Sequence, residues 1–420
     1  MAALLERDLD AAVSDPGPDP RPDPRPDGDA APAALAVRRI ALTRFRNYQS
    51  LRLAAEPRPV VLTGPNGAGK TNLLEALSFL APGRGLRRAR IGQVAQRAPG
   101  ADDAAPVQDW AVAARLDTPT GPVEVGTGRE VVPGEDGAPD GERRIVRIDG
   151  KPAKSQAALG RAIALGWLTP EMDRLFLDAS SGRRRFLDRL VYGFVPDHLS
   201  RLSAYERALR ERARLLREGG ADRSWLVALE QQMAEAGVAI AAARRDLVAR
   251  LNQAASAGIG PFPRPEAAIA GALEGWLDAA PALQVEDRFR AALEASRPRD
   301  ADAGGAAEGP HRSDLHVVHA ARGVPAAESS TGEQKALLIA LVLSTARLQA
   351  LDRGAAPLLL LDEVVAHLDE RRREALFDEV CALGSQAWLT GTDRALFAAL
   401  EGRAQFMDVA AGRIAPAAAR

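Results

Sequence analysis

Apolar residues form short runs near both ends of the chain. Runs at 37–42 and 59–63 are brief and bounded by turn residues, which predicts buried strands, and the spacing after them predicts a helix from Lys70 to about Leu80. The same alternation returns near the C-terminus. There the pattern predicts a helix at 330–351, a strand at 358–361, a helix at 370–383 and a strand at 386–390.

The middle of the chain has a helical period instead. One apolar stripe steps by four and three, which predicts a helix packed on another helix: Leu229, Met233, Ala236, Ile240, Ala243 and Leu247. A looser stripe precedes it: Leu199, Leu202, Leu209, Ala213 and Leu216. Gly219 and Gly220 lie between the stripes, so a hairpin is expected, with a reach of about 30–45 Å at the α-helical rise. A projecting arm and an ordinary helical subdomain both fit this pattern.

These elements predict an α/β fold, with one head built from N- and C-terminal parts and a mainly helical arm inserted between them. The expected parts are a disordered, proline- and charge-rich tail at 1–36, the head at 37–197, the arm at 198–297 and the rest of the head at 298–420. Short strands are expected within 107–150, interrupted by a loop at 132–142. The polar, glycine-rich stretch 296–310 is expected to lead back into the head.

Composition limits the function. The chain of 420 residues has 55 basic and 56 acidic side chains, so any nucleic-acid surface must be a local patch. The single cysteine, Cys381, excludes an intramolecular disulfide and fits a reducing compartment. No run of about 18 uninterrupted apolar residues suggests a membrane span, and the N-terminus lacks a signal-peptide pattern. We therefore expect a cytoplasmic protein with no membrane partner.

The strongest chemical signal is a phosphate-binding loop. The motif G-x-x-x-x-G-K-[ST] is matched by Gly64, Pro65, Asn66, Gly67, Ala68, Gly69, Lys70 and Thr71, between a predicted strand and a predicted helix. Such glycines let backbone N–H groups converge on an anion at a helix N-terminus. Lys70 is expected to reach the β- and γ-phosphates of ATP, and Thr71 to ligate Mg²⁺. Asn72 follows directly and belongs to the expected nucleotide-binding set.

Two carboxylates end the apolar run at 358–361. Asp362 would hold Mg²⁺ and Glu363 would polarise the attacking water, so these two residues and Lys70 are the candidate catalytic groups. The alternative is a strand that simply leaves the core into solvent. The phosphate loop upstream favours the magnesium site.

A serine- and glycine-containing segment, Ser329 to Gln334, precedes this strand by about one helix length. One interpretation is a capping box, in which Ser330 and Glu333 satisfy N–H groups at a helix start. The other is an ATP-binding-cassette signature, in which Ser330 and Gly332 face the γ-phosphate held by another subunit. The two are compatible, because the same exposed N–H groups serve both. His367-Leu368-Asp369 then occupies the place of a D-loop.

The chain resembles the RecF family of DNA-repair ATPases, which are ABC-type and related to structural-maintenance-of-chromosomes heads. The resemblance spans about residues 37–410. It rests on FRNY at 45–48, GPNGAGKTNLLEAL at 64–77, RRRFLDR at 183–189, GPHRSDL at 309–315, STGEQKALL at 330–338, LLLLDE at 358–363 and TGTD at 390–393.

The resemblance implies a weak, DNA-stimulated ATPase of recombinational repair and replication restart. It implies a homodimer that forms on ATP, binds double-stranded DNA and gapped DNA junctions, and helps load RecA with the mediators RecR and RecO. By position, Lys70, Thr71, Asp362 and Glu363 complete one ATP site with Mg²⁺. Ser330 and Gly332 would act on the partner subunit's nucleotide.

Some residues depart from related ATPases. Thr331 replaces the first glycine of a transporter-type signature, and Thr392 lies where transporters often have a switch histidine, which implies slow turnover. No Q-loop glutamine is evident, although Thr169 to Asp173 fills that region. His311 is expected to make a structural polar contact, with a nucleotide-side role as the alternative.

The DNA-contacting residues are less clear. The candidate phosphate-binding arginines form three clusters: Arg84, Arg87, Arg88 and Arg90; Arg183, Arg184 and Arg185; and Arg210, Arg212, Arg214 and Arg217. A solvated helix face is the alternative for the last cluster. Aromatic residues make up 4% of the chain, which favours duplex backbone binding over base stacking.

Two other functions fit parts of the pattern. An ABC-transporter ATPase subunit is disfavoured by the long gap between phosphate loop and signature. A scaffold that does not hydrolyse ATP is disfavoured by the intact Lys70, Asp362 and Glu363. Another DNA clamp related to structural-maintenance-of-chromosomes proteins is a further alternative.

Overall fold

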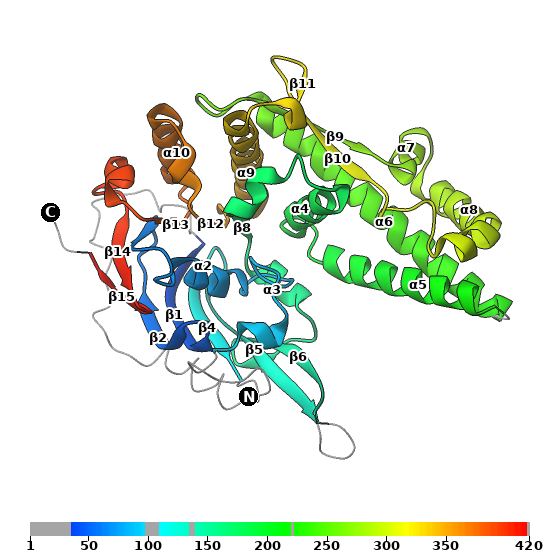
Figure 1. The fold of residues 1–420 in the computed structure, drawn as a ribbon, viewed down its shortest axis with the longest axis horizontal. Helices are drawn as coiled ribbons and strands as arrows, with labels where there is room; N and C mark the ends of the chain where they lie inside the picture. Colours follow the sequence, from blue (N-terminus) through cyan, green and yellow to red (C-terminus); the bar gives the residue numbers. More distant parts are fainter. Residues whose placement is uncertain (1–34, 97–108, 134–138, 220–221, 418–420) are drawn as a thin grey trace. The chain divides into compact units, whose positions relative to one another are not determined.

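The computed structural model describes residues 35–96, 109–133, 139–219 and 222–417 (Figure 1). The chain divides into two compact units. The head unit comprises Met1–Pro170 and Gln349–Arg420, and the inserted unit comprises Glu171–Leu348. The expected α/β head built from both ends of the chain is therefore confirmed. The predicted disordered tail lies almost wholly outside the described residues.

A six-stranded, mostly parallel sheet forms the centre of the head unit. Its strand order is β15-β14-β3-β13-β12-β8. The bounds are β3 Val60–Thr63, β8 Leu165–Leu168, β12 Leu358–Leu361, β13 Ala387–Gly391, β14 Gln405–Ala410 and β15 Arg413–Pro416. Only the β14–β15 pair is antiparallel. Strands β3, β12 and β13 are buried along their whole length, as their continuous apolar sequences predict.

Helices and short helical turns connect the strands of the head unit, and the last of those before the inserted unit, η2, crosses into it. They are α2 Lys70–Ser78, η1 Ile91–Val94, α3 Ala157–Ala162, η2 Pro170–Arg174, η4 Val364–His367, α10 Glu370–Ala382 and η5 Arg394–Leu400. Because β13 pairs with both β3 and β12 in parallel, the carboxyl ends of all three strands meet at one edge of the sheet.

A second, antiparallel sheet completes the head unit, with order β2-β1-β4-β5-β6-β7. The bounds are β1 Ala36–Phe45, β2 Tyr48–Ala54, β4 Ala111–Thr118, β5 Gly121–Pro133, β6 Pro139–Ile148 and β7 Lys151–Pro152. The loop predicted at 132–142 was too long. Both strands extend into it, because Val131 pairs with Glu142 and Val132 with Gly141 across the hairpin.

Three aromatic rings join the antiparallel sheet to the end of α2. Phe45 on β1, Phe79 just after α2 and Trp110 just before β4 are fully buried. Their centroids lie 5.8 Å apart for Phe45–Phe79, 5.6 Å for Phe45–Trp110 and 5.1 Å for Phe79–Trp110, all edge-to-face. The helix that begins at the phosphate loop is therefore fixed at its far end by a rigid cluster.

The inserted unit combines helices with a small sheet. The helices are α4 Ser180–Tyr192, α5 His198–Glu218, α6 Arg223–Ser256, α7 Ala272–Ala279 and α8 Ala282–Ala303. The sheet has order β11-β10-β9, with β9 Pro265–Ala270, β10 Asp314–His319 and β11 Val324–Pro325. The turn η3 Ala326–Glu328 leads to α9 Thr331–Arg353, which ends in the head unit.

The predicted helical hairpin is present as α5 and α6. Met233 and Ile240 of the predicted stripe are fully buried, and they share a core with Tyr205 of α5 and Phe289 of α8. Helix α8 was not predicted. It continues to Ala303, into the polar stretch 296–310 that was expected to lead back into the head. The polar residues misled the prediction because several of them are buried in ion pairs.

This ion network links α5, α6 and α8. Arg212, with 1% of its side chain exposed, donates to Glu230 and Asp300 at 2.9 Å each. Arg297 also donates to Glu230. Arg212 was a candidate DNA contact, and its burial excludes that role. Removing one member of such a network leaves an unpaired buried charge, which destabilises a fold strongly.

The two arginine-containing motifs of the inserted unit have structural roles. Arg244 donates to both carboxylate oxygens of Asp188, at 2.8 and 2.9 Å, and to the carbonyl of Pro310. Arg183 makes a similar two-point contact with Asp314, at 2.8 and 2.7 Å. These contacts fasten the RRRFLDR helix to the GPHRSDL segment.

His311 makes the structural polar contact expected for it. Its Nε2 lies 3.0 Å from the Ala306 carbonyl, which can only accept, so Nε2 carries the proton and Nδ1 accepts from the Tyr205 hydroxyl at 2.7 Å. Burial lowers the pKa of His311 to about 4. Gly309 precedes this contact with φ 137°, and a Cβ there would lie 2.2 Å from the Tyr205 hydroxyl oxygen.

A neutral buried histidine makes stability depend on pH. The folded-state pKa of His311 is depressed from its ordinary 6.5 to about 4, so the unfolded chain binds more protons between these values. The free energy of unfolding should therefore fall as pH decreases from about 6.5 to about 4. We expect His311→Asn to reduce this slope in denaturant titrations. His316→Asn, at an exposed site on β10, is the control, and equal slopes for both variants would contradict the prediction.

Candidate functional site

The phosphate loop leaves β3 at Thr63 and enters α2 at Lys70. Gly64, Gly67 and Gly69 have φ values of 151°, 78° and 117°, which other residues rarely adopt. A Cβ on Gly64 would lie 2.1 Å from the Val409 carbonyl oxygen, and one on Gly69 would lie 2.6 Å from the Asn47 side-chain amide. The glycines are thus required by backbone conformation and by close packing.

The FRNY segment supports this loop from behind. The Tyr48 hydroxyl donates to the Gly69 carbonyl at 3.0 Å, and the Asn47 amide donates to the Ala68 carbonyl at 3.3 Å. Arg46 binds both carboxylate oxygens of Glu75 on α2, at 2.8 and 2.7 Å. The turn between β1 and β2 therefore fixes both the loop and its helix.

Lys70 folds back over the loop. Its ammonium donates to the carbonyls of Gly64 at 2.7 Å and Pro65 at 3.0 Å. Burial lowers the pKa of Lys70, while the nearby Glu363 and Asp362 carboxylates oppose that shift. The Lys70 ammonium and the two carboxylates are therefore close enough for their charges to interact.

Asp362 lies directly beside the phosphate loop. It is 4% exposed and accepts from the Thr71 hydroxyl at 3.0 Å and from the Thr390 hydroxyl at 2.8 Å. Burial raises the pKa of Asp362. The next residue, Glu363, has left-handed backbone geometry (φ 51°), and its N–H donates to the Thr390 hydroxyl at 2.9 Å.

These groups border a pocket of about 230 Å³. Its lining residues come from both predicted halves of the site: Asn66, Gly67, Gly69, Lys70, Thr71, Asn72, Arg87 and Glu363. Gly64 and Pro65 take part through the carbonyls that hold Lys70, Ala68 is buried within the loop, and Asp362 lies behind Thr71. Two stretches far apart in sequence therefore form one site.

Two residues of the site were missed from the sequence. Thr390 is the penultimate residue of β13, the strand between those that carry the loop and the acids, and it orients both Asp362 and Glu363. Arg87 was grouped with possible DNA contacts, yet it lines the pocket and donates to the Asn72 side chain at 2.8 Å. A hydroxyl at the end of an otherwise apolar core strand was the available signal for Thr390.

The signature segment lies at the exposed start of α9, in the inserted unit. Ser330 and Glu333 form the reciprocal capping box, with both N–H···O contacts at 3.4 Å. Ser330 and Gly332 are exposed. In the D-loop position, Asp369 caps α10 by accepting from the Arg372 N–H at 2.9 Å.

The donor set fits a magnesium ion. Thr71 and Asp362 bring a hydroxyl and a carboxylate oxygen within 3.0 Å of each other, and such hard oxygen ligands suit Mg²⁺ when phosphates and water complete its shell. Within the part of the chain that the structure describes, no group of three or more His, Cys, Asp or Glu side chains forms a metal site of its own.

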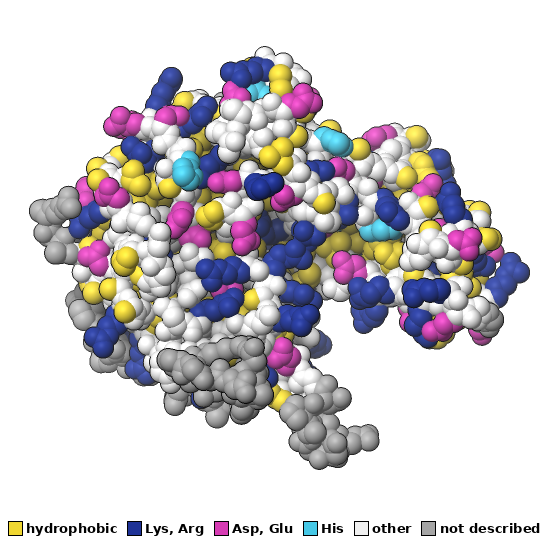
Figure 2. Space-filling view, in the orientation of Figure 1, with side chains coloured by type: hydrophobic (Ala, Val, Ile, Leu, Met, Phe, Trp, Pro, Cys, Tyr) yellow, Lys and Arg dark blue, Asp and Glu magenta, His cyan; other side chains and the backbone are white. Residues whose placement is uncertain are grey.

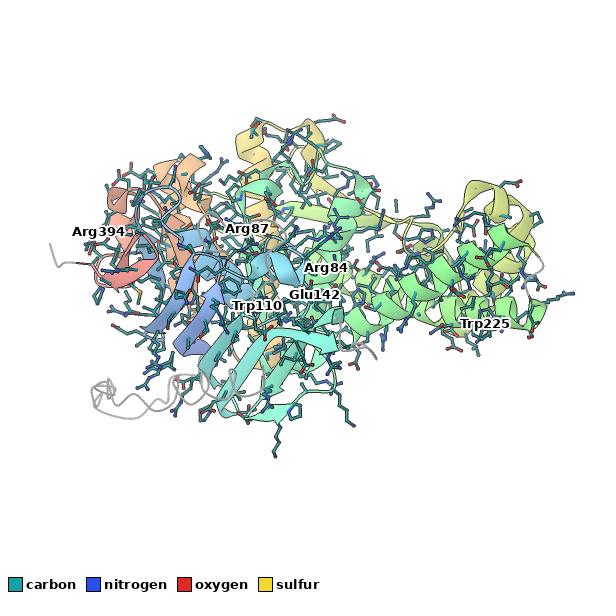
Figure 3. The ribbon with its side chains drawn as sticks, turned by 60° about the horizontal axis from the view of Figure 1, so that its bottom comes forward. Arg84, Arg87, Trp110, Glu142, Trp225 and Arg394 are labelled. Atoms are coloured by element: carbon teal, nitrogen blue, oxygen red, sulfur yellow. The ribbon has the colours of Figure 1, made fainter. Side chains whose placement is uncertain are left out.

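The remaining arginine clusters differ in their surroundings. Arg84, Arg88 and Arg90 are exposed on the segment between α2 and η1. Arg183 and Arg184 are held by Asp314 and the Ser313 carbonyl. Figure 2 shows dark-blue basic side chains gathered near the middle of the head unit, with acidic side chains interspersed over the rest of the visible face. Figure 3 labels Arg84 and Arg87 on the head unit.

The parallel sheet, the phosphate loop after β3 and the paired acids after β12 define the class as an ABC-type P-loop ATPase head. A family model described as RecF/RecN/SMC N terminal domain matches residues 36–409, and the chain belongs to the RecF family of DNA replication and repair proteins. The expected family is thus confirmed.

Close relatives support this assignment over nearly the whole chain. The DNA replication and repair protein RecF of Mesorhizobium japonicum is 50% identical over 387 residues, covering 92% of this chain and 99% of the relative. RecF of Brucella suis is 49% identical, covering 91% and 97%. A solved structure of the recombination mediator protein RecF with ATPrS, in the RecFOR pathway, superposes with a TM-score of 0.78 at 20% identity over 92% of this chain and 99% of its own. A RecF–ATP structure gives 0.77 at 20% identity, over 93% and 100%.

Among the described helices, α9 alone has the length and hydropathy of a membrane span. Of its most apolar window, 83% is buried inside the protein. Packing in the protein interior therefore accounts for its composition.

Thr390 provides a test of how the acids are oriented. Thr390→Val keeps the shape but removes the hydroxyl that serves Asp362 and the Glu363 N–H, so the free energy of unfolding should fall by about 1–3 kcal/mol. Denaturant unfolding followed by circular dichroism measures this loss. Thr345→Val is the matched control, because that buried hydroxyl donates only within its own helix, to Leu341 at 2.8 Å. Similar losses in both variants would argue against the assigned role.

Proposed function

We propose that this protein is an ATP-dependent, double-stranded-DNA-binding protein of recombinational repair, with slow ATP hydrolysis. The main support for this proposal is the contact between the two halves of the site. Thr71 of the phosphate loop and Asp362 after β12 lie 3.0 Å apart, with Lys70 and Glu363 lining one pocket beside them. Such an arrangement suits a triphosphate with its metal ion.

In this proposal the loop N–H groups and Lys70 bind the phosphates, while Thr71 and Asp362 hold Mg²⁺. The metal ion would neutralise developing negative charge when bound. Glu363 orients the attacking water from the edge of the pocket. Arg87 adds a second cationic contact to the phosphates, since its guanidinium borders the same space and is oriented by Asn72.

A second copy of the chain would cap the nucleotide. The exposed start of α9, with Ser330 and Gly332, offers N–H groups and a hydroxyl suited to a γ-phosphate held by another subunit. ATP then stabilises the dimer because it binds the closed pair better than separate subunits. Thr392 at the switch position supports slow turnover.

Double-stranded and gapped DNA are the proposed macromolecular ligands, with RecR, RecO and RecA as protein partners by family relationship. The exposed arginines between α2 and η1 suit phosphate contacts. A transporter subunit is disfavoured, because the close relatives over more than nine-tenths of the chain are DNA replication and repair proteins.

Two variants separate ATP binding from hydrolysis. Lys70→Met should abolish nucleotide-dependent dimerisation, because the phosphates lose their lysine. Glu363→Gln should retain ATP and accumulate as a DNA-bound dimer, because hydrolysis is slowed while binding groups remain. Light scattering with and without ATP measures the masses. The same mass for both variants under ATP would defeat this mechanism.

Duplex binding should depend on nucleotide and salt. Fluorescence anisotropy with labelled duplex is expected to show tighter binding with ATP than with ADP or without nucleotide. The double variant Arg84→Ala/Arg90→Ala should weaken binding and reduce the salt slope by about one per lost phosphate contact. Arg214→Ala, whose side chain is paired with Glu211 and Glu218, is the control. Affinity that does not respond to nucleotide would contradict the proposed function.

A further inference from the structure

A buried arginine lies at the end of α2 that is opposite the phosphate loop. Arg144, on β6, donates to the Gly83 carbonyl at 2.7 Å and to the carbonyls of Phe79 and Ala81. Its Nε donates to the Thr127 hydroxyl at 2.8 Å, and its guanidinium lies 5.0 Å from the centroid of the Phe79 ring. All of these hydrogen-bond partners are neutral oxygen atoms.

The position explains how a buried cation is tolerated here. Carbonyls at and just beyond a helix end lack intrahelical donors, and the Phe79 carbonyl, at the C-cap of α2, lies at the negative end of the helix dipole. A guanidinium offers five N–H donors in a fixed plane, so one side chain satisfies several of them at once. Burial lowers the pKa of Arg144 to about 9, so the group remains charged at neutral pH.

The carbonyls held by Arg144 begin the segment that ends at the pocket. Gly83 is also fixed through its N–H, which donates to Gln156 at 3.1 Å, and the Leu86 N–H donates to Ser78 at 2.7 Å. Gly85 has φ 71°, and a Cβ there would lie 2.7 Å from the Phe79 ring. Arg87 comes next in the chain and lines the pocket. The path from Phe79 to Leu86 therefore places the Arg87 backbone, from which the guanidinium reaches Asn72 at 2.8 Å and Glu75 at 3.5 Å.

We propose that Arg144 is a positioning residue for nucleotide binding, acting from outside the pocket by fixing the segment that presents Arg87. The proposal rests on the proposed function, because it takes the pocket to be the triphosphate site. A purely structural arginine would stabilise the head unit without any special connection to Arg87.

A double-mutant cycle distinguishes these roles. Arg144→Met removes the donors and keeps an apolar stem, and we expect it to weaken ATP affinity about tenfold, the effect of losing one charge-assisted contact. Arg87→Ala should give a similar loss. The double variant should bind ATP no more weakly than Arg87→Ala alone, because both changes remove the same contact. Arg144→Lys should restore part of the affinity, since an ammonium reaches only some of the carbonyls. Calorimetry with ATP on the full chain measures all four variants.

Controls make the result decisive. Arg212→Met removes a buried arginine from the inserted unit and should lower folding stability with ATP affinity unchanged. Additive losses for Arg144→Met and Arg87→Ala, or wild-type affinity in Arg144→Met, would overturn the inference. If Arg144→Met does not fold, Arg144→Lys takes its place in the cycle. Wild-type ATP affinity in Arg144→Lys, or a loss that adds to that of Arg87→Ala, would then overturn the inference. If the wild-type protein binds no ATP, the proposed function is contradicted as well. If ATP binding depends on Lys70 but is unchanged in the Arg144 variants, only the inference about Arg144 is contradicted.

Discussion

The contact between Thr71 and Asp362 is the constraint on which the site depends, since it joins two stretches of chain separated by most of the sequence. Strand order makes it possible. Because β13 lies between β3 and β12 and runs parallel to both, the phosphate loop, Thr390 and the paired acids emerge along one edge of the sheet. The apolar strands therefore do more than build a core. They bring polar residues together at their ends with a precision that loops alone would not supply.

Residues outside the pocket position each part of the site. Asn47 and Tyr48 support the phosphate loop, Arg46 binds the helix through Glu75, and the aromatic cluster fixes the far end of that helix. The antiparallel sheet thus supports the phosphate loop and its helix without lining the pocket. The inserted unit has a comparable pattern, because Arg244 pairs with Asp188, Arg183 pairs with Asp314, and the start of α9 is exposed.

Sequence patterns were reliable where one physical requirement dominated. The phosphate-loop glycines, the leucine strand and its acids were located because backbone conformation and burial leave few alternatives at those positions. Patterns failed where polar residues are buried in pairs. Arg212 and Asp300 resemble surface residues in sequence, yet their mutual contact allows α8 to continue through a stretch of linker-like composition. Thr390 and Arg87 were missed because their roles depend on strand neighbours and loop path. The domain boundaries predicted at 197 and 297 remain predictions.

Strand β14 and the turn that follows it also contact the phosphate loop. The Val409 carbonyl packs over Gly64, and the Gly412 N–H donates to the Ala68 carbonyl at 3.1 Å. During synthesis, the loop emerges from the ribosome before these partners, which lie far downstream in the sequence. A nascent chain therefore cannot complete the packing around the phosphate loop until β14 and the turn after it have emerged. A product truncated before Val409 would keep the glycine-rich motif without the carbonyl that packs over Gly64.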